Sequence, residues 1–407
     1  MRGLSAVFVC WLVLAAAASA GPLPPARITL GDEVFLAQTW HDLGKRCVGV
    51  VTNQTGVTSA QESIVDAIRS NPKICIKAIF APEHGLRGDR PAGSYVASYK
   101  DGRTGLPVYS LYGPTRRPTA AMLRNVDVLL YDIQDVGART YTYISTLAYV
   151  MQAAAAAHKE VWVLDRPNPT GGMKVEGPVL DRRFSSFIGL YPIAMRHGMT
   201  VGELAQMFNE AFGIRAKLRV VEMRDWLRSM LWPETGLFWV QSSPNIPDWS
   251  TTVLYPCTGL IDHAGLNNAT GSAKPFAYAG TLGLNADAYA DNLNAFTLPG
   301  VYFRPAAWSP FAGFWAGKTL TGVELVVYNP RIFAPVKTAV ELLTVARRLQ
   351  PSSISIRSAH ALDTDWGTDS LRRGLLAGES ADQIVAGWQR DLDAFQKLRA
   401  RYLLYGD

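Results

Sequence analysis

The pair Glu83-His84 is the feature of the sequence that most directly suggests acid–base chemistry. A carboxyl group beside an imidazole is a common arrangement for proton transfer. The pair follows a short apolar run, and Arg87 lies a few residues further on. A structural alternative remains for His84, which could serve only to hold Glu83. For Glu83 itself we favour a functional role.

Polar residues also follow four other short apolar runs. Each group has a structural alternative: Asn53 and Thr55 could cap a helix, Asp165 and Arg166 could form an ion pair, and the two roles are evenly balanced for Asp132 and Asp135. Carboxylates, arginines and aromatic rings in such groups are typical of sugar hydrolysis. The candidates for substrate contact in these groups are Asn53, Tyr112, Gln134, Arg139, Asp165, Arg166 and Asn168, and the further catalytic candidates are Asp132 and Asp135.

Several other chemistries lack their sequence signals. Neither GxGxxG nor GxxxxGK[ST] follows a strand, and GxSxG is missing, which argues against nucleotide binding and esterase activity. The sequence contains no CxxC, HxxxH or HxH spacing, so we expect no metal and no cofactor. The formal net charge of +6 comes without a run of Lys or Arg. This charge suits a small anionic substrate better than nucleic acid.

The apolar runs that precede these residues predict an α/β fold. Continuous β-branched runs indicate strands buried on both faces of a parallel sheet, and amphipathic segments between them indicate helices. Ligands bind outside the carboxyl ends of such strands, where the polar groups fall. The predicted strands are Cys47 to Thr52, Ile74 to Phe80, Leu106 to Leu111, Val126 to Ile133, Val161 to Leu164 and Leu218 to Glu222, and the predicted helices include Tyr141 to His158 and one that begins at Thr200.

A second, smaller α+β domain is expected after Pro244-Asn245-Ile246-Pro247, where this rhythm changes. We place the domains at residues 21–255 and 256–407. The second domain should contain a strand near Val323 to Tyr328, a helix from Pro335 to Leu349 and a last helix opened by Ser380 with one apolar stripe. Five aromatic residues precede it, each favoured as packing although together they could wall a cleft: Trp226, Trp232, Phe238, Trp239 and Trp249.

Residues 1–20 have the features of a cleaved secretory signal. Arg2 precedes an apolar stretch, and Ala18-Ser19-Ala20 precedes Gly21. The stretch is too short to span a bilayer, so we expect a periplasmic or secreted protein without a membrane span. Lipid attachment at Cys10 is the minor alternative.

Three cysteines remain after the expected cleavage, so they cannot all pair. A bridge between Cys47 and Cys75 is conceivable because they fall in successive strands, but buried free thiols are the preferred interpretation. Cys257 is the third.

Together these motifs resemble the exo-β-N-acetylmuramidases of bacterial cell-wall recycling, over nearly the whole chain after the signal. The matching segments are Val51 to Gly56, Ala81 to Gly88, Thr104 to Gly113, Asp132 to Arg139, Leu164 to Pro169, Arg196 to Thr200 and Ser243 to Pro247. The resemblance implies a Rossmann-like doubly wound N-terminal domain, a smaller C-terminal domain and an active site in the cleft between them. It also adds Arg196 and His197 as substrate-binding candidates.

One segment, Tyr255 to Ala277, departs from the family pattern. A family glutamate aligns with Asp262, an arginine with Thr270 and a second glutamate with Ala277. A shorter carboxylate and a lost arginine change the fit to the substrate. Asp262 therefore joins the catalytic candidates.

The resemblance implies release of N-acetylmuramic acid from the non-reducing end of muropeptides or disaccharides derived from peptidoglycan. Glu83 would be the general acid, and Asp132, Asp135 or Asp262 the second carboxyl group. The substrate's acetamido group could supply the nucleophile, and covalent and inverting routes stay open. Among four matching arginines, Arg87 and Arg139 are favoured as ligands of the lactyl carboxylate, ahead of Arg166 and Arg196.

Two alternatives to this function remain open. One is a wall-binding protein of the same fold that has lost catalysis, suggested by the altered segment. The other is an exported hydrolase of a different amino sugar.

Overall fold

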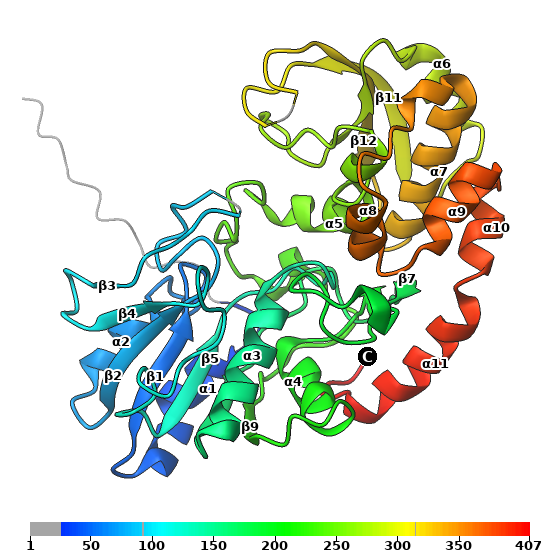
Figure 1. The fold of residues 1–407 in the computed structure, drawn as a ribbon. Coiled ribbons are helices and arrows are strands. Elements are labelled where there is room, and N and C mark those ends of the chain that lie inside the picture. The colour runs from blue at the N-terminus through cyan, green and yellow to red at the C-terminus, as the bar shows by residue number, and fades with distance from the viewer. Residues whose placement is uncertain (1–25, 92, 314) are drawn as a thin grey trace, which may run out of the picture.

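The computed structural model describes residues 26–91, 93–313 and 315–407. A large sheet with helices on both faces forms the N-terminal part, and a smaller three-stranded sheet with helices forms the C-terminal part (Figure 1). The expectations for residues 1–20, including the signal and Cys10, lie outside the described residues. No helix in the described ranges is both long and apolar enough to cross a bilayer.

The N-terminal sheet confirms the predicted α/β fold. Its seven strands run in the order β3-β4-β2-β1-β5-β6-β9, and all neighbours are parallel except the edge strand β3. The six parallel strands follow the 3-2-1-4-5-6 order of the Rossmann fold. Every predicted strand is present. The bounds are β1 Cys47–Thr52, β2 Cys75–Ala81, β3 Tyr99–Lys100, β4 Pro107–Ser110, β5 Val128–Asp132, β6 Glu160–Leu164 and β9 Lys217–Val221.

Helices cover both faces of this sheet because both faces are apolar. Along β5, Val128 and Leu130 pack into one core cluster, and Leu129 and Tyr131 pack into the other, as expected when successive side chains alternate across a strand. The first cluster receives α1 (Gly31–Ala37) and α2 (Ile64–Ser70); the second receives α3 (Tyr143–Ala156) and α4 (Val201–Glu210). The predicted helix start at Thr200 is confirmed, and Thr200 and Glu203 form a capping box at the N-terminus of α4.

The C-terminal part contains an antiparallel sheet of order β10-β12-β11 against α6, and α6 in turn contacts α7. Its strand β12 and helix α7 match the predicted strand and helix. Remaining elements are β7 Glu176–Val179, β8 Ala194–Arg196, β10 Tyr278–Thr281, β11 Val301–Trp308, β12 Leu320–Val327, α5 Trp249–Thr258, α6 Ala286–Asn294, α7 Pro335–Leu349, α8 Ala359–Trp366 and α9 Ser370–Ala377. Short 3₁₀ helices are η1 Thr39–Leu43, η2 Arg182–Phe184, η3 Trp232–Thr235, η4 Asp262–Ala264, η5 Pro351–Ser353 and η6 Ala400–Tyr402.

The prediction of one long last helix after Ser380 was wrong. Ser380 does open a helix, α10 (Ala381–Ala386), but Gly387 ends it and α11 (Gln389–Arg399) follows. Glycine weakens a helix, and the indole of Trp388 turns inward to donate a hydrogen bond to Ser370 Oγ at 2.8 Å. In Figure 1, α11 returns toward the N-terminal part, beside which the chain ends.

The preferred interpretation of the cysteines was also wrong for two of them. Cys47 and Cys75 form a disulfide. They are the first residues of the adjacent strands β1 and β2 and are paired in the sheet register. Strand pairing thus brings together two cysteines that are far apart in sequence, while Cys257 is a buried free thiol.

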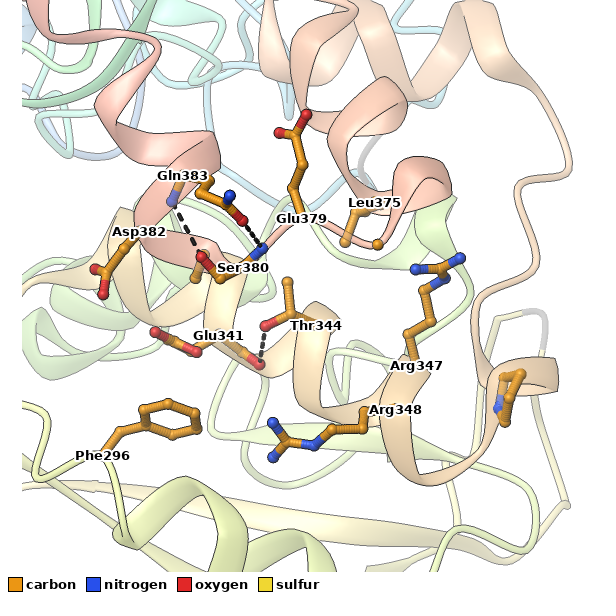
Figure 2. Close-up of a pocket in the computed structure, with 13 residues that line it drawn as sticks. Phe296, Glu341, Thr344, Arg347, Arg348, Leu375, Glu379, Ser380, Asp382 and Gln383 are labelled. Atoms are coloured by element: carbon orange, nitrogen blue, oxygen red, sulfur yellow. Dashed lines mark hydrogen bonds between the residues drawn. The ribbon is translucent and has the colours of Figure 1, made fainter.

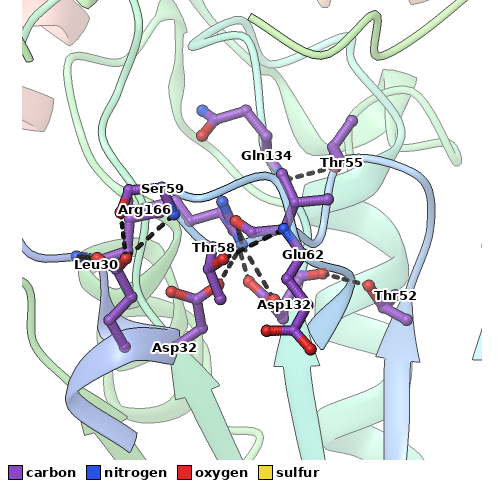
Figure 3. Close-up of polar contacts among 12 residues, drawn as sticks. Leu30, Asp32, Thr52, Thr55, Thr58, Ser59, Glu62, Asp132, Gln134 and Arg166 are labelled. Carbon is purple, nitrogen blue, oxygen red and sulfur yellow. Dashed lines mark hydrogen bonds and ion pairs between the residues drawn. The ribbon is translucent and has the colours of Figure 1, made fainter. Parts of the chain in front are cut away.

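A buried ionic cluster joins the carboxyl ends of the central strands (Figure 3). Arg166, just after β6, donates to Asp132 Oδ2 at 3.0 Å and to Asp32 Oδ2 at 2.8 Å. It also donates to the carbonyl of Val57 at 2.8 Å. The three charged side chains are at most 3% exposed. One guanidinium therefore connects α1, β5, β6 and the segment after β1.

We predict that Arg166→Met lowers the free energy of unfolding by about 3 to 5 kcal/mol, because it leaves two carboxylates buried without their cation. Urea unfolding followed by circular dichroism measures the change. The matched control is Arg103→Met, which breaks an ion pair with Asp66 whose arginine side chain is 68% exposed and should cost far less. An equal, small loss in both variants would contradict this role for Arg166.

Candidate active site

One cavity combines predicted catalytic residues from the two parts of the chain. Its volume is about 290 Å³. Glu83 and His84 come from the N-terminal part, and Asp262 comes from the C-terminal part. The lining residues are Glu83, His84, Thr140, Tyr141, Thr142, Tyr143, Ile188, Ser243, Asn245, Ile246, Tyr255, Gly259, Asp262, Asn268, Thr270 and Phe276.

Glu83 follows β2 and lies in a nest of hydrogen-bond donors. Its Oε1 accepts from the N–H of Gly93 at 2.9 Å, and its Oε2 accepts from Thr142 Oγ1 at 2.7 Å. The hydroxyl of Tyr112 also hydrogen-bonds to it; burial and the Glu83 charge raise the pKa of Tyr112 to about 12. Thr142 directly precedes α3, and a helix N-terminus favours negative charge. Both carboxyl oxygens of Glu83 are therefore held by hydrogen-bond donors from separate parts of the chain.

His84 is held beside Glu83 in a fixed orientation. Its backbone has a φ of 69°, in the left-handed region that few non-glycine residues adopt. The ring Nδ1 lies 2.7 Å from the carbonyl oxygen of Arg90. A carbonyl only accepts, so Nδ1 carries the proton and Nε2 is free of it in the neutral ring.

Asp262 has different surroundings from Glu83. Its side chain is 47% exposed at the cavity wall, and the partial loss of water around the carboxyl group is the main cause of its raised pKa. The adjacent His263 opposes this effect, because its Nδ1 lies 4.0 Å from Asp262 Oδ1. His263 also contacts the carboxylate of Asp365, a hydrogen bond that raises the pKa of the imidazole. Asp262 is thus a carboxyl group at the cavity wall whose pKa lies above its ordinary value.

Asp262, His263 and Asp365 could also hold a metal ion. Their ligand atoms lie within 4.8 Å of one another. However, Arg139 Nη2 donates to the carbonyl of Asp365 at 3.1 Å, and the imidazole of His263 already hydrogen-bonds to the carboxylate of Asp365. These contacts disfavour a metal.

The rest of the cavity wall suits a sugar. Tyr255 packs edge-on against Phe276, with ring centres 5.2 Å apart, and such rings offer an apolar face to a pyranose. The amides of Asn245 and Asn268 offer donors and acceptors for hydroxyl and acetamido groups. The sequence did not suggest any of these four residues as a site residue. The motif Ser243 to Pro247 contains Asn245, but no motif in the sequence pointed to Asn268.

Three predicted residues near the cavity are held behind its wall or to one side. Arg139 is fully buried, and this burial lowers its pKa to about 10. Its guanidinium packs closely on Gly367, where a Cβ atom would lie within 2.9 Å of it. Arg87 forms an ion pair with Asp101 at 3.0 Å. Tyr112 is not among the lining residues but touches Glu83.

The other predicted residues that follow the first and fourth predicted strands are buried behind the cavity. Asp135 Oδ2 accepts from the N–H of Gly137 at 2.7 Å and lies 3.8 Å from His197 Nε2. Gln134 donates to the carbonyl of Pro167 at 2.8 Å. Asn53 accepts from Thr55 at 2.9 Å in a turn, so it does not cap a helix. These contacts indicate that Asp135, Gln134 and Asn53 hold the backbone in position.

The predicted residues after the fifth predicted strand, together with Arg196, also hold the backbone in position. Asp165 pairs with the N-terminus of α4 and with Tyr405, accepting from Gly202 N at 2.8 Å and from Tyr405 at 2.6 Å. Asn168 donates to the carbonyl of Met199 at 3.0 Å. Arg196 donates to the carbonyl of Thr170 at 2.9 Å. Asp132 and Arg166 belong to the buried cluster described above.

The five aromatic residues, each favoured as packing although together they could wall a cleft, are not among the described residues that line this cavity. Trp226 and Trp232 are buried, as the packing interpretation expected. Trp249 lines a separate hollow beside β12.

A larger cavity of about 540 Å³ lies in the C-terminal part (Figure 2). Its wall includes Glu341, Arg347, Arg348 and Ser380. Among the described residues, it contains none of the candidates that the sequence suggested, so we place the chemistry in the smaller cavity.

The chain matches known proteins over most of its length. The family model described as exo-beta-N-acetylmuramidase NamZ, N-terminal, matches residues 48–250, and its C-terminal counterpart matches residues 253–405. The peptidoglycan beta-N-acetylmuramidase NamZ of Bacillus subtilis (strain 168) is 42% identical over 379 residues, which are 93% of this chain and 92% of that protein.

Two crystal structures of DUF1343 family proteins from Bacteroides fragilis NCTC 9343 share the fold. One has a TM-score of 0.88 at 37% identity and covers 94% of this chain and 100% of its own. The other has a TM-score of 0.74 at 26% identity and covers 93% and 99%. The family models together match most of the chain, and they place the boundary between their two parts beside the cavity. The chain belongs to the exo-β-N-acetylmuramidase NamZ family.

Proposed function

We propose that this protein is an exo-acting glycosidase that releases N-acetylmuramic acid from the non-reducing ends of peptidoglycan fragments. The observation that carries the proposal is the cavity in which Glu83 and Asp262 meet from different parts of the chain. Paired carboxyl groups in contrasting surroundings are the usual machinery of glycoside hydrolysis. Family membership and the name of the Bacillus subtilis relative supply the sugar.

The contacts suggest roles that reverse our expectation for Glu83. Asp262, whose pKa is raised by burial, donates the proton to the departing glycosidic oxygen. Glu83, which accepts from Thr142 and Gly93, stabilises the positive charge that develops at the anomeric carbon. In this arrangement His263 sets how easily Asp262 gives up its proton.

A wall-binding protein without catalysis is a weaker proposal for this site. Its motivation was the altered segment from Tyr255 to Ala277, yet Asp262 in that segment lines the cavity with Glu83. Chromogenic muramide and glucosaminide substrates separate the proposals. Release from the muramide supports ours, release from the glucosaminide alone supports another amino-sugar hydrolase, and binding without release supports the binding protein.

We also propose that the protein is exported after loss of residues 1–20. The pattern of Arg2, the apolar stretch and Ala18-Ser19-Ala20 motivates this proposal. The Cys47–Cys75 disulfide supports it, because disulfides persist mainly in oxidising compartments such as the periplasm and the exterior.

We predict that the two carboxyl groups respond differently to the leaving group. Asp262→Asn removes the acid and should slow hydrolysis of a natural disaccharide by about a hundred- to ten-thousand-fold, with a much smaller loss on a nitrophenyl muramide that leaves without protonation. Glu83→Gln should slow both substrates, because charge at the anomeric carbon develops in both. Steady-state kinetics measures these ratios.

The matched control for these variants is Asp291→Asn, an exposed carboxyl group on α6. It should leave both rates unchanged. If Glu83→Gln is rescued by nitrophenol and Asp262→Asn is not, the two roles must be exchanged.

We predict that turnover of the disaccharide falls as the pH rises through the raised pKa of Asp262, since only the protonated form donates. Protonated His263 lowers that pKa. His263→Gln removes this charge, so the alkaline limb of the pH–rate profile should move to higher pH. An unmoved limb would show that Asp262 is not the group observed.

We predict that the exported protein begins at Gly21. Mass spectrometry of the periplasmic or secreted fraction measures its N-terminus, and thiol titration after denaturation should find one free thiol per chain, that of Cys257. A retained Met1 or a lipid on Cys10 would contradict export with this cleavage.

A further inference from the structure

The proposed substrate carries a carboxylate, but the arginines expected to bind it are otherwise engaged. This step rests on the proposed function, since N-acetylmuramic acid differs from N-acetylglucosamine by a lactyl ether on O3. Arg87 and Arg166 already have carboxylate partners. Arg196 pairs with Glu176 at 3.3 Å, and Arg139 has no exposed surface.

Arg116 is a cation of a different kind. It is exposed, in the loop that follows β4, and forms no ion pair with any described residue. Its guanidinium carbon lies 4.2 Å from the ring centre of Phe187 and 5.4 Å from that of Tyr112. Stacking on two rings orients the planar fork and leaves its N–H edges for a ligand.

The rings that hold Arg116 are continuous with the cavity. The hydroxyl of Tyr112 hydrogen-bonds to Glu83, which lines it. Phe187 precedes Ile188, another lining residue, and its ring centre lies 6.0 Å from that of Tyr112. One tyrosine therefore touches the catalytic carboxylate at its hydroxyl and the guanidinium at its ring.

We propose that Arg116 binds the free lactyl carboxylate and so determines specificity for muramic acid over glucosamine. The anomeric carbon and the O3 ether lie on opposite sides of C2 in the sugar, so a pyranose bound over Glu83 presents its lactyl group to one side of the reacting centre. An arginine fork matches a carboxylate bidentately.

The test compares Arg116→Gln with its neighbour Arg117→Gln. Arg117 is also exposed and also lies over a ring, 4.4 Å from the centre of Tyr149, so it is a matched control. The substrates are nitrophenyl N-acetylmuramide and its lactyl methyl ester, which has the same shape without the charge. Thermal unfolding of each variant checks that it folds.

We expect Arg116→Gln to lower kcat/KM for the free acid roughly 10- to 100-fold, mainly through KM, because hydrogen bonds to a charged group are lost. The methyl ester should be hydrolysed equally by wild type and variant. Arg116→Lys should recover part of the loss, since it keeps the charge without the fork. Arg117→Gln should behave as wild type.

Two results would overturn the assignment: an Arg116→Gln variant that hydrolyses the acid as wild type does, or one that loses acid and ester equally. If wild type hydrolyses neither substrate, the proposed function fails instead. Calorimetric binding of N-acetylmuramic acid and N-acetylglucosamine then tests Arg116 without turnover. Loss of the preference for the acid in Arg116→Gln supports the assignment, and an unchanged preference refutes it.

Discussion

Arg166 and its two buried carboxylates fix the carboxyl ends of the central strands, from which the active-site loops start. Asp132 is the last residue of β5, and the chain continues from it to Thr142 at the start of α3. The hydroxyl of Thr142 donates to Glu83. A buried charge without its partner is strongly destabilising. The cluster therefore allows little variation in where β5 ends relative to α1 and β6. The geometry of the site therefore depends on a buried ionic cluster that does not line the cavity.

A second constraint acts between the two parts of the chain. The C-terminal tail returns to the N-terminal part, where Tyr405 donates to Asp165 and Leu404 N donates to Glu203 Oε1 at 2.9 Å. Arg399 donates to the carbonyl of Gly198 at 2.7 Å. Because Glu83 and Asp262 lie in different parts, their separation depends on these contacts. The last residues of the chain thus help to set the shape of the cavity, although they do not line it.

The fold was predictable because its signals are local. A run such as Val128 to Asp132 is apolar on both faces, and burial on both faces is what a parallel sheet requires. The position of Glu83 at the cavity was predictable for a related reason, since it follows such a run. The roles of Asp132 and Asp165 were not, because a carboxylate at a strand end looks the same in sequence whether it meets substrate or a distant partner. Asp32 and Tyr405, which decide these two cases, lie far away along the chain.

The charges of the cavity explain how an anionic substrate can enter it. Glu83 and Asp262 would together repel a lactyl carboxylate if both were ionised, and like charges in a poorly solvated site raise each other's pKa. Burial already raises the pKa of Asp262, and an approaching anion raises it further. In the proposed mechanism, substrate binding thus favours protonation of Asp262, the group assigned there as proton donor, while Thr142, Gly93 and Tyr112 donate hydrogen bonds to Glu83. A neutral amino sugar would lack this effect, so the same anion that identifies the substrate also prepares the acid.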